Sequence, residues 1–226
     1  MSGVANRAYL SVWLQEHSEG AMLENFRRFL EAAPFSSQAP TFPHMVIRAV
    51  NAAEPLLVEA SLQGTAADAY GAVQLIAEHL HSDCSYELES WWDLWTYAPE
   101  NGAWELRPQP LLIFCHGQDY DDGRAQTDGQ IEAGLGFEHF FTGHADMIAA
   151  STIMAAPENP AEAAYVTVMS QDQQRDIYNE KTRDNVRRLL EWVKQVRAMP
   201  KVERIRLWSE GEENFEARLD EILAWR

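Results

Sequence analysis

The chain has 226 residues, of which 46% are hydrophobic and 11% aromatic, and it contains eight tryptophans. This composition excludes a disordered protein, because that much apolar material can offset the entropy lost on folding. The formal net charge is −17, with 35 acidic side chains against 18 basic ones. Free nucleic acid is therefore not an expected partner, since the whole-protein field repels a polyanion and each phosphate contact needs a cation.

The chain has no feature that predicts export or membrane insertion. No apolar segment reaches the roughly 20 residues that a helix needs to cross a bilayer. Residues 1–14 contain one arginine and a short alternating segment, without the apolar region and cleavage site of a signal peptide. The two cysteines, Cys84 and Cys115, are too few for a disulfide framework and lie in no CxxC spacing. We therefore expect a cytoplasmic protein, with no membrane partner, in which both thiols are buried.

Strand and helix patterns alternate regularly in the first half of the chain. They predict, in order, a strand at 8–14, a helix at 22–33 closed by Pro34, strands at 42–50 and 56–62, a helix at 65–80 and a long strand at 85–97. The order βαββαβ resembles the ferredoxin-like arrangement, in element order alone and without a shared sequence motif. Because that arrangement occurs in proteins of many unrelated functions, the resemblance implies an α+β fold and no particular activity.

The second half is less regular. Its patterns predict short strands at 103–107 and 111–117, an alternating strand at 131–141, a linker at 143–160, a long helix ending near Met199, a strand at 202–208 and a final helix. We interpret the chain as α+β, with a ferredoxin-like half at 1–98 and a second α+β half at 99–226 that shares its core. One continuous domain is the alternative.

The strand at 85–97 carries tryptophan on both of its faces. Trp91, Trp95 and Tyr97 would share one face with acidic side chains, and Trp92 would lie on the other. Such a strand is either covered on both sides or leaves an aromatic patch exposed. We therefore predict that Trp91, Trp95 and Tyr97 take part in a protein interface or line a ligand groove.

A cluster of histidine and aspartate offers a second candidate site. His139, His144 and Asp146 lie within eight residues, and His116 ends a neighbouring predicted strand. Imidazole and carboxylate ligands suit zinc, iron or manganese, so these four residues could hold a transition metal if the chain turns at Gly143. The spacing matches no established ligand pattern, and the alternative is a core histidine beside an exposed turn. No cofactor is otherwise predicted.

Arg204 and Arg206 offer a third candidate site. On the strand at 202–208 they would share a face with Trp208, opposite Ile205 and Leu207. Paired guanidinium groups beside an aromatic ring can hold a carboxylate or phosphate. Ion pairs with the many acidic side chains of the chain are the alternative explanation.

No catalytic signature is present. The chain lacks GxGxxG, GxxxxGK[ST], GxSxG and HExxH, so P-loop proteins, typical dinucleotide-binding folds, common α/β-hydrolases and zincins are not indicated. We therefore expect a non-enzymatic binding protein that presents an acidic surface with aromatic anchors to a protein partner or to another copy of itself. The alternatives are a metal-dependent enzyme, such as a hydrolase, that uses the His/Asp cluster, and a small-molecule binder that uses the aromatic groove.

Overall fold

The computed structural model describes residues 6–62, 68–98, 102–142 and 172–224. The strands are β1 (Arg7–Leu14), β2 (His44–Ala49), β3 (Leu56–Ser61), β4 (Cys84–Ala98), β5 (Ala103–His116), β6 (Ile131–Phe137) and β7 (Val202–Ser209). The helices are α1 (Glu19–Ala32), α2 (Ala69–Ala77), α3 (Arg124–Thr127), α4 (His139–Thr142), α7 (Asp172–Arg197) and α8 (Phe215–Ala224), with a short helical turn η1 (Tyr120–Asp122) before α3. The linker expected at 143–160 lies outside the described residues.

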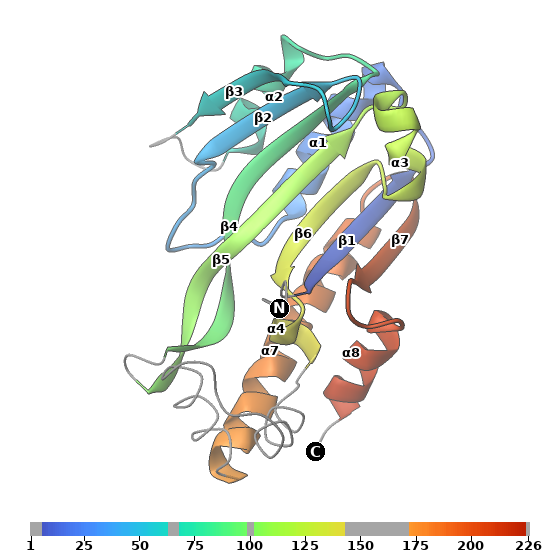
Figure 1. The fold of residues 1–226 in the computed structure, drawn as a ribbon. Helices are drawn as coiled ribbons and strands as arrows, with labels where there is room; N and C mark the ends of the chain where they lie inside the picture. The colour runs from blue at the N-terminus through green and yellow to red at the C-terminus, as the bar shows by residue number, and fades with distance from the viewer. Residues whose placement is uncertain (1–5, 63–67, 99–101, 143–171, 225–226) are drawn as a thin grey trace.

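The described strands form one antiparallel sheet in the order β3-β2-β4-β5-β6-β1-β7 (Figure 1). This confirms a mixed α+β fold. The first six elements follow the expected βαββαβ order, but β1 pairs with β6 and β7 and with no strand of residues 1–98. The ferredoxin-like arrangement is therefore not confirmed, and strands from both expected halves, 1–98 and 99–226, lie in the same sheet.

The segments expected at 103–107 and 111–117 form the single strand β5, which pairs with β4 over its whole length. Pro108 and Pro110 interrupt the sequence pattern between them, because proline has no N–H to donate. Both prolines lie outside Leu112–Cys115, the part of β5 that pairs with β6. The strand therefore tolerates them, as free strand edges do.

The strand expected at 131–141 is shorter in the structure. β6 ends at Phe137, and His139 begins the short helix α4. The change of direction occurs at Gly136, whose φ of +93° is open to glycine and strained for other residues. The sequence pattern does not reveal that β6 ends at Phe137, because the residues after Phe137 continue to alternate between apolar and polar side chains.

Helices cover one face of the sheet: α1, α2 and α7 lie behind it in the view of Figure 1, and α8 packs beside α7. Alternate strand residues point toward them and are buried, among them Leu10, Val12, Tyr86, Leu88, Trp92, Ile113, Ala133 and Leu135. The expected stripe of α7 packs against this layer through Val186, Leu189, Val193 and Val196. Cys84 and Cys115 are both buried and unpaired, as expected. No helix in the described part of the chain is long and apolar enough to span a membrane.

Two tryptophans form the centre of the core. Trp92 of β4 and Trp192 of α7 are each 1% exposed, and their ring centroids lie 5.9 Å apart. Phe141 packs against Trp92 at 5.8 Å, and Phe29 packs against Trp192 at 5.6 Å. Aromatic groups of this size dominate core energetics, so these contacts attach α1, α4 and α7 to the middle of the sheet.

Asn185, which is 1% exposed on α7, satisfies backbone groups that have no strand partner. Its Oδ1 accepts a hydrogen bond from Trp95 N at 2.8 Å, and its Nδ2 donates to the carbonyl oxygens of Trp95 and Phe140, each at 3.1 Å. On the side of β4 away from β5, Trp95 has no neighbouring strand among the described residues, because β2 pairs only with Cys84–Leu88. One amide therefore joins α7, β4 and the start of α4.

Asn185→Ala should lower the free energy of unfolding by about 2 to 4 kcal/mol, because it leaves buried backbone groups without partners. Urea denaturation followed by tryptophan fluorescence measures the change. Gln195→Ala, at an exposed position of the same helix, is the matched control and should stay within about 0.5 kcal/mol of wild type. If the two variants had the same urea midpoint of unfolding, the role assigned to Asn185 would be contradicted.

Glu132 of β6 is a buried acid on the opposite face of the sheet. It is 4% exposed and lies in register between Ser11 of β1 and Phe114 of β5. Among the described residues its carboxyl makes no hydrogen bond or ion pair, and burial raises its pKa from 4.5 to about 7. The folded protein therefore holds a proton that the unfolded chain releases, and this group costs stability as the pH rises through that interval.

Glu132→Gln should remove this cost. Variant and wild type should unfold at similar urea concentrations near pH 4.5, and the variant should be about 2 to 3 kcal/mol more stable near pH 8. Glu203→Gln, at an exposed position of β7, should not show this pH-dependent gain. A constant difference between Glu132→Gln and wild type across the pH range would show that the carboxyl is already ionised in the fold.

Candidate functional site

The face of the sheet that the long helices leave uncovered is the principal candidate for a functional surface. We call it the open face. Its residues, taken from β3 across to β7, are Leu57, Glu59, His44, Val46, Arg48, Ser85, Glu87, Glu89, Trp91, Pro110, Leu112, Phe114, His116, Glu132, Gly134, Tyr9, Ser11, Trp13, Arg204, Arg206 and Trp208. We assign these residues to the open face from the two-residue period of each strand and from the pairing registers between strands.

The segment η1–α3 packs over one end of the open face. Trp13 Nε1 donates a hydrogen bond to the carbonyl oxygen of Gln126 at 3.1 Å. Tyr120 lies parallel to His116, with ring centroids 5.7 Å apart. Among the described residues, no helix lies in front of the middle of β4 and β5 in the view of Figure 1.

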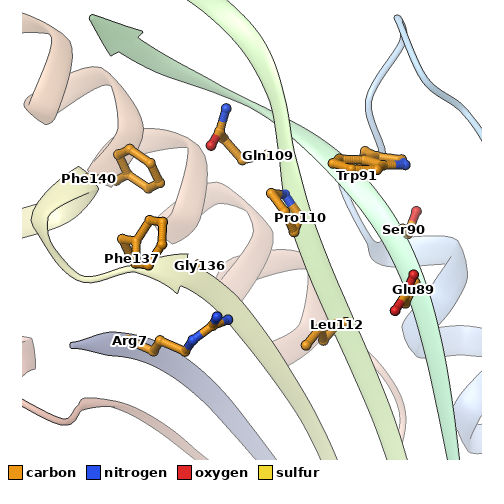
Figure 2. Close-up of a pocket in the computed structure, with 10 residues that line it drawn as sticks. All are labelled: Arg7, Glu89, Ser90, Trp91, Gln109, Pro110, Leu112, Gly136, Phe137 and Phe140. Atoms are coloured by element: carbon orange, nitrogen blue, oxygen red, sulfur yellow. The ribbon is translucent and has the colours of Figure 1, made fainter. Parts of the chain in front are cut away.

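A hollow of about 280 Å³ lies in this uncovered part (Figure 2). It is lined by Arg7, Glu89, Ser90, Trp91, Gln109, Pro110, Leu112, Gly136, Phe137 and Phe140, which come from β1, β4, β5, β6 and the start of α4. The hollow occurs where β5 runs beyond its pairing with β6. Gly136 has no side chain to fill the space between Phe140 and Pro110, which a Cβ there would touch at 3.7 and 3.8 Å.

The hollow is apolar at its centre and charged on two sides. Trp91, Pro110, Leu112, Phe137 and Phe140 supply the apolar surface, and Phe137 is 38% exposed. The guanidinium carbon of Arg7 lies 5.6 Å from the centroid of the Phe137 ring, and Arg7 makes no ion pair within the described part of the chain. Glu89, on the other side, lies 3.6 Å from His44 Nδ1.

The three predicted aromatic anchors do not share one surface. Trp91 lines the hollow, half-buried. Trp95 lies beneath α7, with Lys181 Nζ 3.9 Å from the centroid of its ring. Tyr97 packs against Trp104 at 5.7 Å, near the tip of the β4–β5 hairpin. A 15-residue strand twists along its length, so residues on one nominal face come to point at different neighbours. The binding roles of all three remain predictions.

Arg204 and Arg206 share the open face with Trp208, as the alternation of the strand indicated. The guanidinium carbon of Arg204 lies 3.6 Å from the ring centroid of Trp13, and that of Arg206 lies 5.4 Å from the ring centroid of Trp208. Tyr9 stacks on Trp208 with centroids 4.4 Å apart. Neither arginine makes an ion pair within the described residues, although the chain is strongly acidic. Their role in anion binding remains a prediction.

The predicted metal ligands are separated. His116 lies at the end of β5, beside the start of β6, whereas His139 follows the other end of β6. The length of β6, about 20 Å, therefore lies between them. His144 and Asp146 fall outside the described residues. Within the described part of the chain, no three His, Cys, Asp or Glu side chains are grouped to hold a metal ion. A site that includes His144 and Asp146 stays a prediction.

His116 instead belongs to a small polar pocket of about 70 Å³ under η1–α3. Its lining residues are Arg48, Ala52, Ser85, Glu87, Phe114, His116, Tyr120 and Arg124. The Nδ1 atom of His116 lies 2.8 Å from Ser85 Oγ. Burial, with a smaller effect of the Arg124 guanidinium, lowers the pKa of His116 to about 3. A neutral imidazole with so low a pKa is a weak general base at neutral pH, so the Ser85–His116 contact is suited to structure more than to catalysis.

Several residues of the hollow were not singled out from the sequence, namely Arg7, Pro110, Gly136, Phe137 and Phe140. Glycine within an apolar strand often marks a bulge or a close approach, and Gly134 and Gly136 were the available signal. The register of β1 and β6 does shift between Ala8 and Tyr9, opposite these glycines. Arg7 and Phe137 meet only because distant strands pair, which no local pattern indicates.

The chain was compared with protein-family models, with curated protein sequences and with solved structures, and none of the three comparisons found a match. The functional argument therefore depends on the open face itself.

Proposed function

We propose that this chain is a non-enzymatic binding protein that recognises a protein partner through the open face of its sheet. The observation that carries the proposal is the apolar hollow at Trp91, on a sheet face that no long helix of the described residues covers. A cytoplasmic location is part of the proposal, and the two free, buried thiols support it, since reduced cysteines are usual in that compartment.

The hollow is large enough for a partner's side chain. Its volume of about 280 Å³ lies at the lower limit of pockets for drug-sized ligands, about 300 to 1,000 Å³. Protein interfaces concentrate binding energy in a few aromatic or arginine anchors that enter such hollows. Trp91 and Phe137 offer flat apolar walls, and Arg7 and Glu89 could orient the backbone or charges of the bound segment.

A small amphipathic anion is the second candidate ligand. Arg7 supports it, because its guanidinium group lies beside the apolar surface without an ion-pair partner among the described residues. The enzyme alternative has less support. Of the side chains that line the hollow, only Arg7 and Glu89 are charged, and they come from strands separated by β5 and β6.

The hollow should bind 1-anilinonaphthalene-8-sulfonate, whose apolar rings fit against Trp91 and whose sulfonate can pair with Arg7. Fluorescence titration should show saturable binding of one dye per chain. Trp91→Ala and Arg7→Gln should each weaken it at least about tenfold, which corresponds to about 1.4 kcal/mol. The titration should be repeated over a range of protein concentrations, because a partner on the open face would compete with the dye.

Tyr70→Ala is the matched control, because Tyr70 is an aromatic residue on α2 that is 63% exposed and distant from the hollow in sequence and fold. It should leave dye affinity unchanged. If Trp91→Ala and Tyr70→Ala bind the dye equally, or if binding never saturates, the hollow is not a recognition site and the proposed function fails.

A further inference from the structure

Among the described residues, β7 is the end strand of the sheet, and no strand lies beyond its outer edge (Figure 1). Backbone groups of successive residues in a strand point alternately to its two sides. The N–H of Leu207 points outward, because Glu216 Oε1 of α8 accepts its hydrogen bond at 3.1 Å. The N–H and C=O of Ile205, two residues earlier, therefore point outward as well. No described residue forms a backbone hydrogen bond with them there, so this edge can accept a further strand.

Arg204 and Arg206 flank Ile205 and lie on the open face of this edge. Arg204 is held over the ring of Trp13, and Arg206 lies beside Trp208. Both arginines are exposed, and neither makes an ion pair with a described residue. A carboxylate on an added strand would therefore meet two donors that are already placed, which lowers the entropy lost on binding.

The other face of the same edge opens into a groove of about 310 Å³ between α7 and α8. It is lined by Leu190, Val193, Arg197, Ile205, Leu207, Glu216, Leu219 and Asp220. Five of these eight side chains are aliphatic, and the three charged ones are exposed. A residue directly opposite Ile205 on an added strand has its side chain on the same face of the sheet as Ile205. An apolar side chain at that position would therefore lie in this groove.

We infer that the edge of β7 binds an extended acidic segment of a partner protein as an additional antiparallel strand. The segment carries an apolar residue between two acidic ones. The apolar residue exchanges backbone hydrogen bonds with Ile205 and occupies the groove, and the two acids lie opposite Arg204 and Arg206. In this mode of recognition the main-chain hydrogen bonds supply affinity and the alternate side chains supply specificity. None of the residues that line the hollow comes from β7, so this second site does not depend on the function proposed for the hollow.

A second copy of β7 suits this edge poorly. If Ile205 paired with itself about a two-fold axis, Arg204 of each copy would lie directly opposite Arg206 of the other. Like charges directly opposite each other destabilise a strand pair. The two arginines thus disfavour self-association through this edge and favour a segment of opposite charge.

The edge of β7 is basic although the whole chain has a net charge of −17. Exposed charges more than about 8 Å apart are largely screened at physiological salt, so the nearest groups dominate. β7 carries two arginines and one acid, Glu203. Of the neighbouring acids, Glu216 accepts the hydrogen bond of Leu207 N, and Glu210 accepts that of the Tyr9 hydroxyl. The two guanidinium groups therefore set the local charge that a bound segment meets.

Three identically fluorescein-labelled pentapeptides test the inference. The acidic peptide is Thr-Glu-Ile-Glu-Thr, the basic peptide is Thr-Lys-Ile-Lys-Thr, and the proline peptide is Thr-Glu-Pro-Glu-Thr. Fluorescence anisotropy should show saturable binding of the acidic peptide to the wild-type chain. The other two should bind at least about tenfold more weakly, because lysine meets the arginines with like charge and proline has no N–H to donate to the carbonyl of Ile205.

Arg204→Glu with Arg206→Glu should reverse the preference, so that the basic peptide binds at least about tenfold more tightly than the acidic one. The gained binding also shows that this variant is folded. Lys194→Glu, on α7 with its side chain 77% exposed, is the matched control and should keep the wild-type preference. The inference is overturned if the acidic peptide does not saturate, if the basic peptide binds wild type equally well, or if the proline peptide binds as tightly as the acidic one. The last two outcomes would leave the arginines with the general role of protecting a sheet edge.

Trp91→Ala separates this site from the hollow and should bind the acidic peptide as tightly as wild type. If Trp91→Ala loses the peptide together with the dye, the peptide occupies the hollow. The edge site is then overturned, and the function proposed for the hollow stands. If the dye test of the hollow fails while the peptide preference and its reversal are observed, the edge site stands alone.

Discussion

The structure depends on a seven-stranded sheet whose longer described helices, α1, α2, α7 and α8, all pack against the same side. Trp92 and Trp192 meet at the centre of that side, and the apolar stripe of α7 completes the core around them. A sheet buried on both faces would need near-continuous apolar strands. These strands alternate instead, and the open face carries half-buried aromatic side chains beside exposed charged ones. The hollow is a consequence of this arrangement, because it lies on the side away from these helices.

The position of β1 joins the two ends of the chain. It lies between β6 and β7, so the N-terminal strand connects segments that are more than one hundred residues away in sequence. Through this pairing Arg7 reaches Phe137, and Tyr9 reaches Trp208. Residues of the first strand thus complete the hollow and pack against the aromatic side chain of β7. The open face therefore forms only after the long-range pairing of the sheet is in place.

One group on the open face carries an energetic cost. Glu132 is buried with a raised pKa and no partner among the described residues. Arg204 and Arg206, by contrast, are exposed and lie over aromatic rings, so water and cation–π contacts satisfy their charges. Glu132 is therefore the position on this face where the sequence departs from what stability alone would favour.

Local sequence patterns were sufficient to predict the α+β class, most strand and helix positions, the buried stripe of α7, the burial of both cysteines and the shared face of Arg204 and Arg206. These features depend on the periods of the strand and the helix, which neighbouring residues determine. Tertiary structure alone decided four other features. These are the continuity of β5, the early end of β6, the separation of His116 from His139, and the different neighbours of Trp91, Trp95 and Tyr97. They depend on strand order, twist and a glycine turn, which arise from contacts between residues far apart in the chain.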